Sequence, residues 1–391
     1  MKILFCIHSM NLGGTEKALL ALLNELDLTN NEVTILLLEQ KGELLDQIPH
    51  GVTVEALKGF EKMRPIIFNS PRSYALNDFR KGNVLNAVKT LIRYTKVKTG
   101  NSWHYNYIEA LKHYPIRYKT DIAVAYAGPS DFISYIILNN VDAKKKFQWI
   151  HFDITKMISN TKFGNRFYPY FDKIFCVSKN ARDTFVKTFP QFESKTEVFE
   201  NIVSENLIRQ QAETGESFTD DFKGIRILTL GRLSEEKGQR MIPAVVKRLK
   251  DEGLDFRWYL IGEGKLRANL EEQIKKLGIE NELILLGLKI NPYPYLKDCD
   301  LYVQTSLHEG YCLTIHEAKI FKKPVVTTAV LSAPNLIENQ GDGLIIAISI
   351  DGIYSGVREL ITNKARREKF ERFIKKPKLK SSEKIESLIA K

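Results

Sequence analysis

Short apolar runs alternate with helical patterns along the first half of the chain. The strand-like runs are "KILFCI", "EVTILLLE", "DIAVAYA", "KKFQWIH" and "DKIFCVS", and the helical patterns include "TEKALLALLNEL" and "NARDTFVKTF". This alternation is typical of βαβ units around a parallel sheet that is covered on both faces. It predicts a doubly wound α/β domain over residues 1–203.

The alternation stops at residues 204–223, which are polar and acidic, and we expect a linker there. It resumes with the strand-like "IRILTLG", "FRWYLIG", "LILLG", "DLYVQTS" and "PVVTT", separated by helical patterns. A second doubly wound domain is therefore predicted over 224–374. The fold class is α/β, with two Rossmann-like domains whose strand ends can face each other across one cleft.

Two regions depart from this alternation. Residues from about 60 to 115 are basic and rich in aromatic side chains, and we interpret them as an insertion of helices and loops in the first domain. Residues 375–391 form a basic segment with helical patterns that can pack back on the first domain.

In doubly wound sheets, ligands bind at the carboxyl ends of the strands. The first strand is followed by Gly13 and Gly14, which let the backbone approach a ligand at a helix N-terminus, where N–H groups and the helix dipole favour phosphate. A tight turn without a ligand explains the glycines equally well. The pattern is not G-x-G-x-x-G, which argues against a nicotinamide cofactor, and "GEGKL" lacks the other residues of a P-loop.

The first strand of the second domain is followed by "LGRLSEEKG", which contains Gly231, Arg232 and Lys237. The two cations can converge on one anionic group, since arginine offers a planar fork to phosphate oxygens and lysine a compact charge. The alternative is a solvated loop with ordinary surface charges.

A second candidate follows a later strand, in "HEGYCLTIHEA". Glu309 lies at the strand end, and Gly310 permits a turn that can point the N–H groups of Tyr311, Cys312 and Leu313 at a ligand. Glu317, inside the following helix, can accept two hydrogen bonds from a diol such as a ribose, because a buried carboxylate needs such partners. Alternatively, both glutamates simply stabilise the helix N-terminus.

"HEGYCLTIHEA" resembles the E-x7-E element of retaining GT-B glycosyltransferases of family 4, whose common form is E-G-F-G-L-x-x-x-E-A. Further similar elements occur in the family's order along nearly the whole chain, among them "GGTEKALL", "WIH", "GRLSEEKG", "EAKIFKKPVV" and "NQGDGLII". The similarity is greatest to enzymes that build bacterial capsule, exopolysaccharide and other surface glycans. The chain departs from the family at Cys312, where glycine is usual, at the Lys322-Lys323 pair, and after "PVVTT".

The resemblance implies a role for each matching residue. Arg232 and Lys237 would bind the donor diphosphate, Glu317 the ribose, and Glu309 the donor sugar. Amides around Tyr311 to Leu313 would meet sugar hydroxyls and phosphate, and Gly14 would lie against the diphosphate. His151, which otherwise only ends a strand, would face the donor sugar.

The resemblance also implies transfer from a nucleotide-sugar with retention of anomeric configuration, by front-face attack assisted by the departing phosphate. UDP is the expected nucleotide and GDP stays open. No cofactor or metal is expected, and the D-x-D at Asp298 and Asp300 precedes a strand as a loop end would. A non-catalytic sugar-nucleotide-binding partner subunit is the alternative.

Charge and composition add an expected location. The chain carries a net charge of +11, and residues 61–120 contain 12 Lys/Arg against 3 Asp/Glu. Such a basic region suits an anionic membrane holding a lipid-pyrophosphate-linked or other glycan acceptor, and we expect Arg80, Lys81, Lys89 and Arg93 to contact it. No nucleic-acid-binding motif is present. Because the N-terminal apolar run is short, we expect a cytoplasmic protein that is peripheral on the inner face of the membrane.

Overall fold

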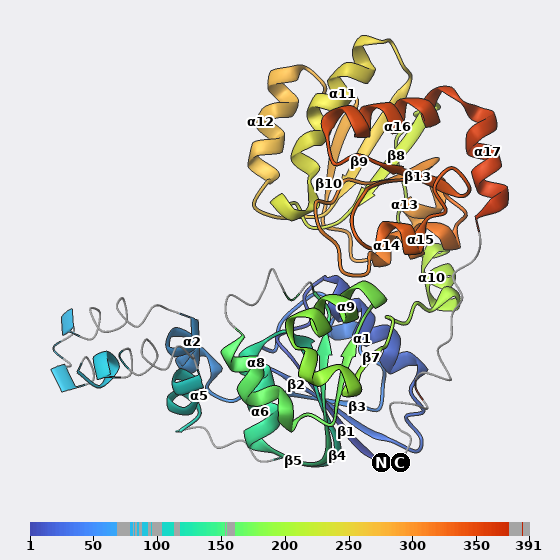
Figure 1. Cartoon of the computed structure of the whole chain (residues 1–391). Helices are drawn as coiled ribbons and strands as arrows, with labels where there is room; N and C mark the ends of the chain where they lie inside the picture. The colour runs from blue at the N-terminus through green and yellow to red at the C-terminus, as the bar shows by residue number, and fades with distance from the viewer. Residues whose placement is uncertain are drawn as a thin grey trace. The chain divides into compact units, whose positions relative to one another are not determined.

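The computed structural model describes residues 1–68, 79–80, 82, 84–85, 88–92, 95, 104–112, 118–152, 154, 161–374 and 385. The chain divides into two compact units, Met1–Glu200 and Asn201–Ser387. Each unit is built on one parallel sheet (Figure 1). The predicted fold class, two Rossmann-like doubly wound α/β domains, is confirmed. No helix in the described part of the chain is both long enough and apolar enough to cross a bilayer.

The first unit has a seven-stranded sheet in the order β3-β2-β1-β4-β5-β6-β7. Its strands are β1 Lys2–Ile7, β2 Glu32–Leu37, β3 Val52–Ala56, β4 Tyr118–Gly128, β5 Val141–Ile150, β6 Lys173–Cys176 and β7 Thr196–Val198. Every pairing is parallel, and β1 lies between β2 and β4. The strand order reverses between β1 and β4, so their carboxyl ends border the crevice in which such sheets bind ligands.

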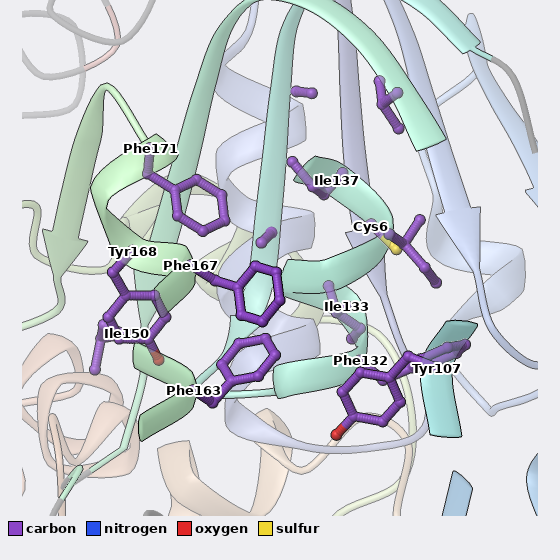
Figure 2. Packing of buried hydrophobic residues seen from close by; sticks show 14 of the residues in the cluster. Cys6, Tyr107, Phe132, Ile133, Ile137, Ile150, Phe163, Phe167, Tyr168 and Phe171 are labelled. Atoms are coloured by element: carbon purple, nitrogen blue, oxygen red, sulfur yellow. The ribbon is translucent and has the colours of Figure 1, made fainter. Parts of the chain in front are cut away.

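Helices cover this sheet and supply its core. They are α1 Gly14–Glu25, α2 Phe60–Phe68, α5 His104–Leu111, α6 Asp131–Asn140, α8 Lys162–Phe167 and α9 Lys179–Thr188, with short 3-10 helices at Leu45–Gln47, Tyr168–Tyr170 and Pro190–Lys195. Figure 2 shows the core beside α6, in which Phe132 and Ile133 meet aromatic rings from α5 and α8. These contacts fix the helix that begins at the carboxyl end of β4.

The second unit repeats the arrangement with six strands in the order β10-β9-β8-β11-β12-β13. Its strands are β8 Ile225–Leu230, β9 Phe256–Ile261, β10 Leu283–Gly287, β11 Leu301–Gln304, β12 Val325–Thr328 and β13 Gly343–Ile346. Its order reverses between β8 and β11, which pair directly. The two candidate loops of the sequence, after β8 and after β11, therefore start from neighbouring strand ends at the switch point.

Separate cores lie on the two faces of this second sheet. Successive strand residues such as Trp258 and Tyr259 belong to different core clusters, because side chains along a strand point alternately to its two faces. The helices are α10 Glu205–Ala212, α11 Ile242–Asp251, α12 Arg267–Leu277, α13 Tyr293–Asp298, α14 Leu313–Ile320, α15 Ala333–Leu336, α16 Ile350–Thr362 and α17 Lys364–Phe373, with 3-10 helices at Glu235–Lys237 and Gln239–Met241.

The segment 204–223, for which we expect a linker, differs from that expectation and folds with the second unit. It contains α10, whose Ile208 and Ala212 are buried in the core on one face of the sheet. Farther along, Asp220 accepts hydrogen bonds from Arg226 at 2.8 Å and from Tyr259 at 2.6 Å. A helix that buries so few residues keeps a polar composition, which explains the linker-like sequence. Apart from Ile385, the predicted tail 375–391 lies outside the described residues, as does most of the insertion between 69 and 103.

Candidate functional site

The loops that follow β8 and β11 are joined by backbone contacts. Gly238 has a φ of +67°, and a Cβ at this position would lie 2.1 Å from the carbonyl oxygen of Thr305. The Thr305 hydroxyl donates to the Lys237 carbonyl at 2.9 Å, and the amide of Leu307 donates to the Glu236 carbonyl at 2.8 Å. Glycine is required here for both its conformation and its size. These contacts bring the two sequence motifs into one site.

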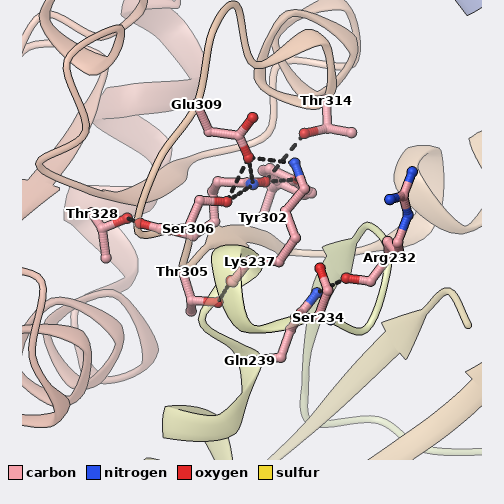
Figure 3. Close-up of polar contacts among 11 residues, drawn as sticks. Arg232, Ser234, Lys237, Gln239, Tyr302, Thr305, Ser306, Glu309, Thr314 and Thr328 are labelled. Carbon is pink, nitrogen blue, oxygen red and sulfur yellow. Dashed lines mark hydrogen bonds and ion pairs between the residues drawn. The ribbon is translucent and has the colours of Figure 1, made fainter. Parts of the chain in front are cut away.

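The centre of the site is an ion pair between the two motifs. The Lys237 ammonium lies 2.6 Å from Oε1 of Glu309, and both side chains are largely buried (Figure 3). Burial alone would lower the pKa of Lys237, but the charge and the hydrogen bond of Glu309, together with smaller contributions from other neighbours such as Glu236, outweigh it and hold that pKa above its usual value. The lysine therefore stays a cation at the carboxyl end of the sheet, where it can meet an anion.

Two buried polar residues that the sequence reasoning missed hold Glu309 in place. Gln304 and Ser306 donate to Oε1 of Glu309 at 3.0 and 2.6 Å. The side-chain amide oxygen of Gln304, Oε1, in turn accepts hydrogen bonds from the Tyr302 hydroxyl at 2.6 Å and the Thr314 hydroxyl at 3.2 Å. In the sequence, these two residues are marked by the polar stretch "QTS", which follows an apolar strand-like run. Glu309 is thus oriented by packed neighbours, as a preorganised site requires.

Arg232 lies in the same loop as Lys237, and its side chain is exposed. Its backbone carbonyl accepts from Gln239 at 2.8 Å, which fixes the loop. Within the described residues its guanidinium forms no ion pair. Gly231 has a φ of +151°, which favours glycine, and a Cβ there would make only ordinary van der Waals contact, at 3.8 Å from Gln239. The loop therefore presents one unengaged cation beside a paired one, which suits a multiply charged anion.

The glycines of "GEGKL" have a structural role. Gly262 has a φ of +150°, and a Cβ there would lie 2.0 Å from the carbonyl oxygen of Gly231. The Leu233 amide donates to the Glu263 carbonyl at 2.9 Å. The segment therefore packs closely against the backbone of the Arg232 loop and holds it by a hydrogen bond.

Helix α14 begins beside the ion pair. Its N-cap, Cys312, adopts the left-handed conformation with φ 60° and ψ 57°, which explains why the related pattern has glycine at this position. Leu313 is the first residue of the helix, so its amide and that of Thr314 have no partner within the helix, whereas the Ile315 amide donates to the Cys312 carbonyl at 3.1 Å. Gly310 and Tyr311 lie in the loop that leads into this helix. The Tyr311 ring stacks on the His316 ring, with 4.8 Å between the ring centroids. These amides and the helix dipole provide a second anion-favouring feature.

Glu317 lies farther along α14 and is 3% exposed. Its Oε1 accepts a hydrogen bond from the Tyr293 hydroxyl at 3.0 Å, another contact that the sequence did not reveal. Tyr293 comes from α13, so this bond connects α14 to its neighbour.

The remaining candidates lie in the first unit. Gly13 is the N-cap of α1 and Gly14 its first residue, after the carboxyl end of β1. His151 follows β5, and its amide donates to the Gly128 carbonyl at 2.9 Å. Burial lowers the pKa of His151 to about 3, so its imidazole is neutral at physiological pH.

The predicted basic contacts are partly described. Arg80 and Lys89 are exposed, whereas Lys81 and Arg93 lie outside the described residues. Asp298 ends α13, and Asp300 accepts from the Arg226 amide at 2.8 Å at the amino end of β11, away from Glu309. The described residues contain no group of three or more His, Cys, Asp or Glu side chains that could hold a metal.

With this geometry established, comparison with known proteins is informative. Residues 214–377 match the family model "Glycosyl transferases group 1". The matched residues lie within the second unit. The match spans the Arg232 loop, the Lys237–Glu309 ion pair and α14.

Two curated relatives agree with this assignment. An uncharacterized glycosyltransferase of Methanocaldococcus jannaschii is 30% identical over 208 residues, which cover 52% of this chain and 50% of that protein. The N-acetylgalactosamine-N,N'-diacetylbacillosaminyl-diphospho-undecaprenol 4-alpha-N-acetylgalactosaminyltransferase of Campylobacter jejuni is 29% identical over 196 residues, covering 50% of this chain and 52% of that protein. The chain spans about half the length of these curated relatives.

Solved structures extend the likeness of fold to the whole chain. The HepE protein of Anabaena, crystallised with UDP and glucose, has a TM-score of 0.67 at 19% identity and is matched over 96% of this chain and 93% of its own. At this identity the comparison shows the fold alone. The fold is therefore GT-B, as expected from the sequence.

Proposed function

We propose that the protein is a retaining, metal-independent glycosyltransferase of the family 4 type that moves a sugar from a UDP-sugar to a glycan or lipid-linked acceptor in surface polysaccharide biosynthesis. The observation that carries this proposal is the Lys237–Glu309 pair at the switch point, flanked by Arg232 and the start of α14. Cations and helix amides at one strand edge fit a diphosphate, and an oriented carboxylate beside them fits sugar hydroxyls.

Each group has a proposed role in the reaction. Arg232 and Lys237 bind the diphosphate together with the α14 amides, and Glu309 holds the donor sugar. Glu317 holds the ribose, with Tyr293 fixing its carboxylate. As the bond between the anomeric carbon and phosphate oxygen breaks, negative charge grows on the diphosphate and the cations stabilise it. The acceptor oxygen attacks from the same face, and its proton passes to the departing phosphate oxygen.

The choice of UDP and of a lipid-linked acceptor rests on the relatives. HepE is a UDP-bound neighbour, and the name of the Campylobacter enzyme describes a diphospho-undecaprenol acceptor. A neutral His151 suits a group that faces a sugar, because it can donate or accept a hydrogen bond without adding charge.

A thermal-shift screen tests donor binding. We expect UDP and UDP-sugars to raise Tm more than GDP, ADP and their sugars, because ligands that bind only the native state stabilise it. Arg232→Ala should lose most of this shift, with about tenfold or weaker affinity if one charge-assisted hydrogen bond of about 1.5–3 kcal/mol is removed. The control is Arg240→Ala, since Arg240 is exposed and its ion-pair partner within the described part of the chain is the exposed Glu235. An unchanged shift in Arg232→Ala would remove this residue from the site.

Membrane contact is the second part of the proposal. The described residues 79–92 expose a set of apolar side chains beside Arg80 and Lys89. They are Phe79, Val84, Leu85, Val88, Leu91 and Ile92, of which Leu85 is 79% exposed. Exposed apolar and basic side chains together fit an anionic bilayer, in which lysine and arginine each contribute about 1 kcal/mol. These side chains support the proposal that the protein acts at the inner face of the cell membrane.

Replacing Arg80, Lys81, Lys89 and Arg93 by Gln should weaken binding to anionic liposomes at low salt, measured by co-sedimentation. The expected loss is about 10²-fold or more, from about 1 kcal/mol per charge. A control variant removes four exposed lysines elsewhere, namely Lys144, Lys187, Lys275 and Lys276. Equal binding by the two variants would show that only net charge matters, and undiminished binding would refute the proposed surface.

A further inference from the structure

An exposed pair of rings lies at the carboxyl end of β1 in the first unit. His8 directly follows β1 and is exposed, and its imidazole stacks on the ring of Phe68 with 6.4 Å between the ring centroids and 13° between the planes. Phe68 ends α2 and is 57% exposed. The buried ring of Phe60, at the start of α2, contacts both rings edge-on. Phe60 therefore supports the pair from the core, and more than half of Phe68 is left to solvent.

The loops after β1 and β2 hold each other at this edge of the sheet. The parallel pairing continues beyond the two strands, since the Glu39 amide donates to the His8 carbonyl at 2.8 Å. The Met10 amide donates to the Lys41 carbonyl at 2.9 Å. Gly42 has a φ of +126°, and a Cβ there would lie 2.0 Å from the carbonyl carbon of Met10. The backbones of His8 and Glu39 are therefore fixed relative to each other, as a preorganised binding site requires.

Charged side chains border the ring pair. The Glu39 carboxylate forms an ion pair with Lys41, and its Oε1 lies 3.5 Å from Nη1 of Arg64. The hydrogen bond from Lys41 holds the pKa of Glu39 below its usual value although burial opposes this, so the carboxylate is ionised at physiological pH. Arg64 and Phe68 are four residues apart in α2 and lie on the same side of the helix. Helix α2 thus brings a ring and a cation to the ends of β1 and β2.

Single exposed apolar side chains are common on protein surfaces and need no explanation. Phe68 differs because two other rings hold it, and because it stands at the edge where doubly wound sheets bind ligands. The adjacent strand β1 is also one of the two at which the strand order reverses. Contact with a bilayer would account for the exposed ring, but it gives no role to the ionised Glu39 carboxylate, which anionic lipid repels.

We propose that His8 and Phe68 form a binding platform for a sugar residue of the acceptor. Glu39 and Arg64 border the platform and are the partners of the sugar's hydroxyl groups. A pyranose ring has a face of C–H groups, which packs on the aromatic pair, and a rim of hydroxyls, to which a carboxylate accepts and a guanidinium donates. The platform rests on the proposed function, in which the second unit binds the nucleotide, and adds to it the residues that select the acceptor.

Glycoside binding to the full chain tests the platform without any donor. The probes are the methyl α- and β-glycosides of glucose, galactose, N-acetylglucosamine and N-acetylgalactosamine, and the method is saturation-transfer difference NMR. The wild type should bind at least one of them. Phe68→Ala should weaken that binding about tenfold, whereas Phe68→Tyr, which keeps the ring, should stay within about threefold. Tyr170→Ala is the control, because Tyr170 is 70% exposed but precedes β6, at the opposite edge of the sheet. No glycoside binding by the wild type, or binding by Phe68→Ala within about twofold of it, would overturn the proposal.

Two further measurements separate the platform from the bilayer and from the donor site. In UDP-release assays with UDP-sugars and the same glycosides, Phe68→Ala should raise the acceptor KM about tenfold and leave the UDP thermal shift unchanged. Weaker binding of Phe68→Ala to anionic liposomes, with glycoside binding intact, would assign the ring to the bilayer and refute the platform. A wild type that binds glycosides through Phe68 but shows no UDP shift would refute the proposed donor and still support the platform.

Discussion

Replacing Lys237 by Met is expected to lower the rate of sugar transfer about 10³-fold, since one preorganised donor to a developing charge is worth about 10²–10³ and a cation contributes more. The loss has two physical causes. The departing diphosphate loses a cation that stabilises its growing charge. In addition, Glu309 keeps the hydrogen bonds from Gln304 and Ser306 but loses its counter-ion, so its negative charge then opposes the diphosphate.

The measurement is kcat and KM for the UDP-sugar, with the thermal shift by UDP recorded alongside. Loss of transition-state stabilisation lowers kcat, whereas loss of simple binding raises KM alone. Lys247→Met is the matched control, because Lys247 pairs with Asp251 on the surface of α11 and should leave the rate unchanged. If Lys237→Met keeps kcat within tenfold of wild type while still binding UDP, the lysine has no role in the reaction.

The sequence predicts the centre of both sheets well and the edges of the first sheet poorly. Central strands such as β1 and β8 are buried on both faces and appear as continuous apolar runs. The edge strands β3 and β7 expose part of their side chains, so neither shows such a run. The helix α10 was missed for a related reason, because only one turn of apolar residues anchors it to the core.

The candidate site shows a similar limit. The loops after β8 and β11 follow apolar runs, and a general rule places such loops at the ligand edge, so Arg232, Lys237 and Glu309 could be chosen from the sequence. Their direct pairing could not, because it depends on Gly238 fitting against Thr305. Gln304, Ser306 and Tyr293 were missed because uncharged polar residues attract notice only once their burial is known.

Lys319→Met is expected to destabilise the second unit by about 3–5 kcal/mol, because removing one partner of a buried ion pair leaves the other charge uncompensated. The Lys319 ammonium lies 2.7 Å from Asp342 and 2.7 Å from the Leu336 carbonyl, and both charged side chains are at most 10% exposed. Among the described residues, the Asp342 carboxylate would keep the hydrogen bond from the Glu338 amide. The measurement is urea-induced unfolding followed by circular dichroism.

The control is Lys297→Met, whose partner Glu213 lies at a similar distance of 2.8 Å but on the surface. It should cost about 0–1 kcal/mol, the usual value of an exposed pair. The double variant Lys319→Met/Asp342→Asn should recover part of the loss, because it no longer buries an unpaired charge. Lys319 is on α14, two residues after Glu317, so UDP binding should weaken in Lys319→Met and recover with stability. If Lys319→Met and Lys297→Met lower the free energy of unfolding equally, the buried pair contributes no more than a surface pair. The segment around Asp342 would then be held by its apolar contacts.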